Sequence, residues 1–558
     1  MTEQHGDRKD EHGDCQSKDE SLVATPPRRS PLRSVLIVAT CTTAMVVNGS
    51  NMASGNIALP TIGRELDVPE AQLQWVVAAY SLASGCLLLL FGRVADLYGR
   101  KRTFVAGCAW LIILSIACSL SNDGITLSIL RGLQGVGGAA TIPSSIGILS
   151  HSFPPSRARS IAFATFAAGA PVGGAYGYQI GGVLTEFTRK TWRSTFYAAA
   201  GLAFLNLILG LIFMDPDVRS SEIDRRIDWL GALLVTAGLV LIFFVLGSGE
   251  VASKQWVTPY IIALLILGVL FLCLFVVWQR YLEQISDTLD YKPKWSTPPP
   301  LIKPSLWGRA NGRMAAIMII ALLNFCCFIG WNFWQQLYYQ RFLGLSPIHT
   351  AIRLLPLFVT GVLCNVLVAF VVSRVPIVYL LGFGTLITSC AALLFAQIQP
   401  SAPYWAFGFP AAILSVVGSD FTFASGTLFI TRAALPHEQS VGGAVFQTMV
   451  QLGTAMGVTI TTVVFNRVLD HELASLDLPA NFPQQDVPKD RLLKCFHSAQ
   501  WTAFAFGITA VLVSTIFFRG VGIVGHRKTQ HSASASGHER VVPSQATGDA
   551  KMEKVPKH

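Results

Sequence analysis

Two charged side chains stand inside long apolar runs of this chain, where charge is rare and suited to proton transfer. Asp420 lies well inside one run, and Arg131 lies two helical turns into the run that begins near Ile125. A carboxyl group removed from water favours its neutral form, so it can take up and release a proton. A buried arginine costs about 2.5–3.5 kcal/mol on insertion scales and requires a polar partner or a cavity.

We therefore predict that Asp420 serves proton coupling and that Arg131 faces a cavity or a polar partner, at different depths and without an ion pair between them. The alternatives are that Asp420 reaches water from a helix end and that Arg131 snorkels to the membrane surface.

A short loop between two apolar runs, residues 92–102, reads GRVADLYGRKR and carries one acid among four bases. Asp96 precedes Arg100 by four residues, the favourable order for a helical ion pair. Glycines at both sides of the acid permit a tight turn and close approach. We predict a conformational latch at a gate, and the alternative is an ordinary basic loop with an incidental acid. The predicted gating residues are Gly92, Asp96, Gly99, Arg100 and Lys101.

Polar and aromatic side chains inside the apolar runs are the candidate substrate contacts. Buried amides require hydrogen-bond partners, so these residues either line a solvated cavity or bind neighbouring helices. Asn324, Trp331 and Gln335 fall on one helical face. The predicted substrate-binding residues are Asn48, Asn51, Tyr178, Gln179, Asn324, Trp331 and Gln335.

Small residues recur at helical spacing in two of the runs. Glycine at every fourth position lets two helices approach closely, and a proline within such a run permits a bend. The predicted helix-packing residues are Gly135, Gly137, Gly169, Pro171, Gly173, Gly177 and Gly181.

Membrane-spanning helices must position all of these residues. The 558 residues are 52% hydrophobic and 13% charged, whereas soluble domains have about 25% charged residues. With about 20 apolar residues per crossing, the chain has about fourteen predicted spans. The fold class is therefore an all-α polytopic membrane protein.

The runs predict two six-helix halves with two helices inserted between them. A proline-containing loop precedes a glycine-striped helix in both halves, at 153–157 and at 435–438. Two such halves around a midplane cavity are typical of transporters. The predicted divisions are a disordered cytoplasmic tail (1–33), the N-terminal half (34–214), the two inserted helices (215–280), a cytoplasmic linker (281–313), the C-terminal half (314–521) with an outer loop (467–498), and a second disordered cytoplasmic tail (522–558).

The bases indicate the orientation, since short cytoplasmic loops are rich in lysine and arginine. The loop at 92–102 belongs to the base-rich set, so both termini are predicted to be cytoplasmic. Arg189, Lys190 and Arg193 are exceptions on the opposite side. The basic residues behind the net charge of +10 flank apolar spans. They form no basic helix face, so nucleic acid is not an expected partner.

The loop motif resembles the signature of the major facilitator superfamily, which looks like G-x-L-A-D-x-x-G-R-[KR]. The loop matches this pattern except that Val94 stands for the usual leucine. The resemblance implies the superfamily fold and alternating access, with Asp96 docking on a helix end of the other half in the outward-open state. The run that starts at Arg131 is similar to the family element R-x-x-Q-G-x-G, which is implicated in proton transfer, so the resemblance implies a proton-coupling role for Arg131 as well.

The first and fifth spans are similar to those of fourteen-span drug:proton antiporters, including the fungal aminotriazole-resistance and low-affinity ammonium transporter-like group. Asn56 and the Ala58-Leu59-Pro60 run match the first-span pattern. Asn51 stands where an acid is expected, and Tyr178 stands where the antiporter element has proline.

The resemblance implies a secondary transporter that exports an organic small molecule, such as a drug, toxin or secondary metabolite, in exchange for protons. The departures at Asn51 and Tyr178 favour an alternative: a uniporter, importer or exporter of a small polar or inorganic solute such as ammonium or borate. We expect a monomer in the lipid bilayer of the plasma membrane, with the vacuolar membrane as the other location.

Enzyme motifs are absent from the sequence, which contains no nucleophile elbow, no H-E-x-x-H and no phosphate-binding G-x-x-x-x-G-K-[ST] loop. We therefore expect neither catalysis nor a cofactor nor a metal.

Overall fold

A computed structural model describes residues 30–519, except 69, 154–156, 218–225, 250–254, 287–296, 372–373, 434–438 and 479–485. The predicted tails lie almost wholly outside the described residues. Part of the predicted linker and most of the two proline loops also lie outside them.

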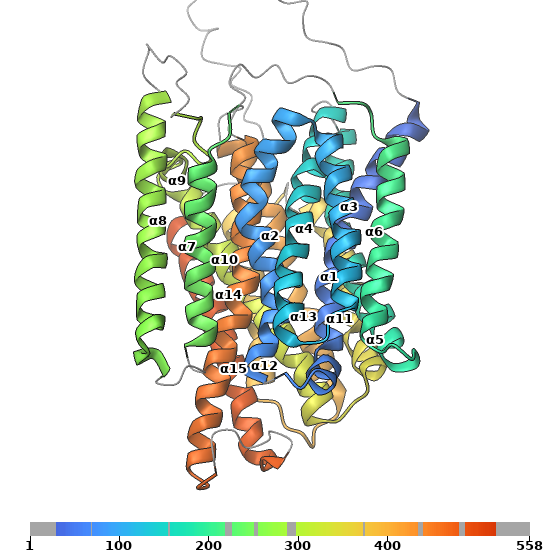
Figure 1. The fold of residues 1–558 in the computed structure, drawn as a ribbon, viewed down its shortest axis with the longest axis vertical. Helices are drawn as coiled ribbons and strands as arrows, with labels where there is room; N and C mark the ends of the chain where they lie inside the picture. The colour runs from blue at the N-terminus through green and yellow to red at the C-terminus, as the bar shows by residue number, and fades with distance from the viewer. Residues whose placement is uncertain are drawn as a thin grey trace, which may run out of the picture.

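The described part of the chain contains fourteen helices of 20 residues or more, arranged as an upright bundle (Figure 1). The first six are α1 (Pro31–Glu65), α2 (Glu70–Tyr98), α3 (Arg100–Ser119), α4 (Gly124–Ser152), α5 (Arg157–Phe187) and α6 (Arg193–Phe213). Next come α7 (Trp229–Ser248), the short η2 (Gln255–Val257), α8 (Pro259–Ser286) and the short α9 (Ser305–Gly308). The last six are α10 (Arg313–Leu337), which continues as the π-helical turn η3 (Tyr338–Phe342), α11 (Pro347–Val371), α12 (Ile377–Ala396), α13 (Tyr404–Ala433), α14 (Gln439–Ala474) and α15 (Lys489–Phe517).

Twelve of these helices are long and apolar enough to cross a membrane. The other two, α4 and α5, also exceed the length of about 20 residues that a crossing requires. Both are rich in glycine, which lowers their hydropathy. The predicted fold class, an all-α polytopic membrane protein, is confirmed.

The two sets of six helices pack in the same order. In the first set, α1 packs on α5, α2 on α4, and α3 on α4 and α6. In the second, α10 packs on α14, α11 on α13, and α12 on α13 and α15. The two sets meet where α2 packs on α14 and α5 packs on α11. The inserted α7 lies against α2 and α14, and α8 lies against α7 at the edge of the bundle (Figure 1).

A buried carboxylate fastens the inserted pair of helices. Asp228 precedes α7 and accepts hydrogen bonds from the backbone N–H of Gly231 (2.8 Å) and from the Trp278 indole of α8 (2.9 Å). It also accepts from the amide of Gln279 (2.5 Å), whose oxygen accepts from the backbone N–H of Ile302 (3.1 Å). One side chain thereby connects α7, α8 and the segment that leads to the second set of helices.

The predicted outer loop at 467–498 is wrong in its extent, because α14 continues to Ala474 and α15 begins at Lys489. Glu472 of α14 accepts hydrogen bonds from Arg491 (2.5 Å) and Lys494 (3.2 Å) of α15. These two ion pairs stabilise the helical ends of α14 and α15 beyond their apolar segments. The resulting helical hairpin projects from the lower end of the bundle (Figure 1).

Candidate functional site

The predicted latch residues lie at the junction of α2 and α3. The Asp96 carboxylate accepts from the Arg100 guanidinium at 2.9 Å, as the spacing predicts. Gly99 has φ +118°, and a Cβ there would clash with the Asp217 carboxylate. That carboxylate accepts from the backbone N–H of Lys101 (2.7 Å) and Arg102 (3.0 Å), which satisfies the start of α3. A glycine is therefore required at 99.

The rest of the loop ties helices of the first set together. The Lys101 ammonium donates to the backbone carbonyls of Leu211 (2.9 Å) and Met214 (2.8 Å) at the end of α6. Gly92, in contrast, has room for a side chain, since a Cβ would lie 3.8 Å from Pro143. Its predicted role in close approach therefore finds no counterpart in this conformation, and docking of Asp96 on the other half stays a prediction.

Arg131 is fully buried in the first set of helices, at 0% exposure. Its guanidinium donates to the backbone carbonyls of Val76 (2.8 Å) and Asn51 (3.1 Å), and to the side-chain oxygen of Gln134 (2.7 Å). It also lies 4.9 Å from the centre of the Tyr80 ring, a cation–π distance. In the described part of the chain, no carboxylate pairs with this charge.

Asn48 and Asn51 belong to the same network. Tyr80 donates from its hydroxyl to the Asn48 amide oxygen (2.6 Å), and Gln134 donates to the Asn51 amide oxygen (3.0 Å). Both asparagines are at most 4% exposed. In this conformation they satisfy neighbouring helices, so their predicted contact with substrate stays a prediction.

The glycine stripes lie at three tight helix crossings: α5 with α1, α4 with α2 and α4 with α3. A Cβ at Gly173 or Gly177 would clash with the α1 backbone, and one at Gly135 would clash with the α2 backbone. Pro171 of α5 instead faces α11, where its Cβ lies 3.0 Å from a Cβ built on Gly361. The remaining stripe residues with close contacts are Gly137 against α3 and Gly169 and Gly181 against α1.

Tyr178 and Gln179 join the two sets of helices. The Tyr178 hydroxyl donates to the Asn332 amide oxygen of α10 (2.7 Å), and the Gln179 amide donates to the Ala351 carbonyl of α11 (2.7 Å). Nearer the end of α1, the Gln340 amide donates to the Ile57 carbonyl (3.0 Å). The sequence did not predict that Asn332 and Gln340 join the two sets of helices. An amide in or beside an apolar run does not reveal which half of the protein its side chain faces.

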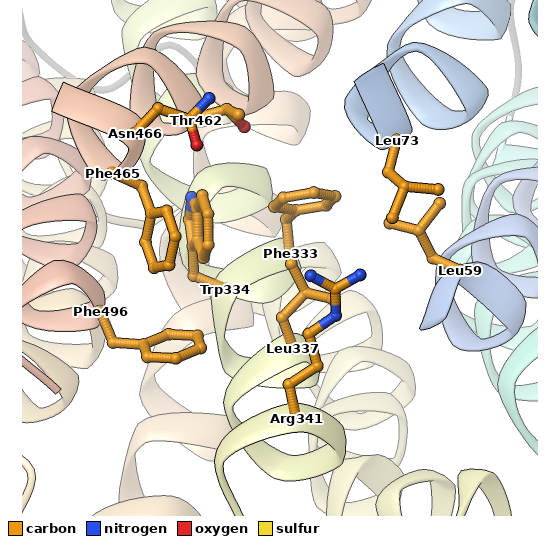
Figure 2. Close-up of a pocket in the computed structure, with 10 residues that line it drawn as sticks. All are labelled: Leu59, Leu73, Phe333, Trp334, Leu337, Arg341, Thr462, Phe465, Asn466 and Phe496. Atoms are coloured by element: carbon orange, nitrogen blue, oxygen red, sulfur yellow. The ribbon is translucent and has the colours of Figure 1, made fainter. Parts of the chain in front are cut away.

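A largely apolar seam, which Arg341, Thr462 and Asn466 also line, adjoins these hydrogen bonds (Figure 2). Leu59 and Leu73 of the first set face Phe333 and Leu337 of α10, with Trp334 of α10 behind them. The Trp334 ring stacks on the Phe465 ring of α14, with 4.2 Å between the two centroids. The free space is about 20 Å³, room for about one water molecule. The two sets are therefore closed against each other at this end.

Asp420 lies half-buried in the second set of helices. Its carboxylate accepts from the Asn365 amide of α11 at 3.2 Å, and the same amide donates to the Gly361 carbonyl at 2.9 Å. Asp420 and Arg131 lie in different sets of helices and form no ion pair. The sequence did not predict Asn365 as a partner of Asp420, because the two residues lie on different helices.

Asn324, Trp331 and Gln335 are all 0% exposed on α10. The Trp331 ring meets Phe395 of α12 edge-on at 5.9 Å, and the Gln335 amide donates to the Tyr339 hydroxyl at 3.3 Å. Among the described residues, the Asn324 amide, the Trp331 indole N–H and the Gln335 side-chain oxygen have no hydrogen-bond partner. They are enclosed within the second set, and their contact with substrate stays a prediction.

Comparison with known proteins agrees with this architecture. The sequence matches the family described as Major Facilitator Superfamily over residues 40–228 and 220–458. The puromycin resistance protein of Streptomyces alboniger is 32% identical, with 73% of this chain and 77% of the relative covered. The low affinity ammonium transporter of Saccharomyces cerevisiae is 26% identical, with 79% and 83% covered.

A solved structure has the same fold at lower identity. It is a bacterial homolog of the human lysosomal transporter Spinster, crystallised in an inward-facing, unoccupied conformation. The TM-score is 0.57 at 18% identity, with 88% of this chain and 98% of that chain covered.

Proposed function

Because this chain belongs to the Major Facilitator Superfamily, we propose that it is a proton-coupled secondary transporter that exports an organic small molecule by alternating access. The observation that carries the proposal is Asp420, a carboxylate within α13 whose described partner is the neutral amide of Asn365. Without a cation to fix its charge, this carboxyl group can change protonation during the cycle.

Proton binding at Asp420 has a direct geometric consequence. The ionised carboxylate accepts from the Asn365 amide, while α13 and α11 pack together. Protonation replaces a charge-assisted hydrogen bond by a weaker neutral one, which loosens the link between these two helices. Arg131 supplies a fixed positive charge in the other half, held by backbone carbonyls.

The positions of the bases support a state that is closed to the outside, with both termini in the cytoplasm. The halves are closed near the end of α1, opposite the base-rich loop at the α2–α3 junction. Two of the three exceptional bases at the closed end have structural partners: the Glu65 carboxylate accepts from Arg193 (3.1 Å), and Lys190 lies 5.0 Å from the Tyr197 ring centre. These two bases therefore do not contradict the positive-inside pattern.

The Asp96–Arg100 pair is our proposed latch for the opposite, outward-open state. In the state closed near the end of α1, the Asp96 carboxylate is bound within its own half. Export of a toxin from the plasma membrane agrees with the name of the Streptomyces relative, a puromycin resistance protein.

A susceptibility screen tests the proposal. A strain lacking the gene is complemented with the wild-type chain, Asp420→Asn or the control Asp477→Asn, which lies in an exposed turn. The wild type and Asp477→Asn should raise tolerance to at least one toxic compound, and Asp420→Asn should not. Full tolerance with Asp420→Asn would remove the proposed coupling role.

A second candidate function is uncoupled movement of a small polar solute such as ammonium or borate. It is favoured by Asn51, which leaves Arg131 without a carboxylate partner among the described residues, and by the name of the yeast relative, an ammonium transporter. Uptake of methylammonium that persists after the proton gradient is collapsed would support this candidate over the first.

A further inference from the structure

A second cavity lies within the C-terminal half, at the end of the bundle where α1 ends. It has a volume of about 320 Å³, which falls at the lower limit of about 300–1,000 Å³ for small-molecule pockets. Its walls come from the π-helical turn η3, the first turns of α11 and the connection between α12 and α13. It is separate from the seam of Figure 2, which lies on another face of α10.

Arg353 of α11 is the charged group of this cavity. Its guanidinium carbon lies 5.3 Å from the centre of the Tyr339 ring and 5.5 Å from that of Tyr404. Tyr404 also donates from its hydroxyl to the Arg353 carbonyl at 2.7 Å, which fixes the backbone there. The two rings therefore hold the guanidinium in place by cation–π contact.

The hydrogen-bonding groups of this arginine are not used by the protein. Among the described residues, the Arg353 guanidinium has no carboxylate partner and no hydrogen-bond acceptor. Its five N–H donors lie at the edge of a planar fork that matches a carboxylate in a bidentate pair. The two tyrosine rings contact the guanidinium without accepting a hydrogen bond from it, so its N–H donors are available to a ligand.

The remaining walls exclude a cation and favour an apolar body. No lining residue is acidic, and most are apolar or aromatic, including Leu343, Ile398 and Phe407. A ligand with one anionic group and a small ring would satisfy the arginine and cover the apolar walls.

We propose that this cavity is a binding site for a small aromatic carboxylate, held by the Arg353 guanidinium. The carboxylate accepts two hydrogen bonds from the guanidinium, and the ring packs against Phe407 and Tyr404. The site does not depend on the identity of the exported compound.

Benzoate binding tests the site on the full chain in phosphatidylcholine nanodiscs, followed by calorimetry. We expect saturable binding of one benzoate per chain. Its neutral isostere benzamide should bind at least about tenfold more weakly, since it loses the charge-assisted pair. Equal binding of benzoate and benzamide to the wild type would overturn the proposal without any variant.

The variant Arg353→Gln localises the binding. It should weaken benzoate binding at least about tenfold, while the control Arg374→Gln, an exposed arginine beyond the other end of α11, should leave it unchanged. Unchanged benzoate binding in a monodisperse Arg353→Gln protein would contradict the assignment. Tolerance of cells to the exported compound, measured separately, reports on the proposed function independently of the benzoate-binding result.

Discussion

Arg131 is a buried charge that the protein stabilises without an opposite charge among the described residues. Three oxygen atoms and the Tyr80 ring surround it, and the oxygens come from α2, α1 and α4 itself. Such a guanidinium acts as a fixed link among three helices. The strength of this link depends on the planar guanidinium group of Arg131, which donates to all three acceptors at once.

Replacement of Arg131 by lysine should therefore damage the N-terminal half although it keeps the charge. An ammonium cannot reach the Val76 and Asn51 carbonyls and the Gln134 amide together. Losing one or two hydrogen bonds to a charged group costs about 1.5–3 kcal/mol each. Thermal unfolding in detergent measures the effect, with Arg374→Lys as the exposed control. Equal midpoints for Arg131→Lys and the wild type would refute this account.

The sequence identified Asp420 and Arg131 by type, because charge in an apolar run is conspicuous. It could not identify the partners that lie on other helices. Gln134 follows Arg131 by three residues on the same helix, but Asn365 is an ordinary amide until the helices are packed, and the same amide type at Asn324 proves to be enclosed and without a partner among the described residues. Which amide meets which charge depends on helix rotation, and hydropathy does not report rotation.

At the scale of elements, the hairpin of α14 and α15 extends the bundle past its apolar length. Its polar composition suggested a loop, yet Glu472 lies at 8% exposure between Arg491 and Lys494. The interaction joins residues 19 and 22 positions apart, so no pattern within a single helix could have revealed it.

We expect Glu472→Gln to loosen this hairpin, since it removes the charge that both bases share. Hydrogen exchange of the backbone amides at 467–478 and 486–495 should become faster. The control is Asp490→Asn, because Asp490 is 76% exposed and lies 3.5 Å from the same Arg491, a geometry that contributes little. Unchanged exchange in Glu472→Gln would mean that apolar packing alone holds the hairpin.

At the scale of the whole molecule, hydrophobic run lengths were sufficient to predict the number of helices, and the repeated packing order confirms the two-half fold. The relation of the halves was not predictable. It depends on contacts such as Tyr178 with Asn332 and Gln179 with Ala351, which are more than 150 residues apart. Alternating access requires that these contacts break in the other state.

Tyr178→Phe should therefore shift the halves toward opening near the end of α1. The phenylalanine keeps the ring beside Phe358 but loses the hydroxyl that donates to Asn332. Spin labels at Asp67 and His349, both exposed near that end, should report a longer and broader distance distribution in the variant. Tyr379→Phe, at an exposed tyrosine of α12, is the control. Identical distributions in Tyr178→Phe and the wild type would contradict the role of this contact.

The most direct test of the central claim is efflux of a compound found by the susceptibility screen, measured in cells with and without an uncoupler. Proton-coupled export predicts that collapse of the gradient abolishes efflux by the wild type, and that Asp420→Asn shows the same low efflux with or without the gradient. Wild-type efflux that continues unchanged after the gradient is collapsed would contradict proton coupling.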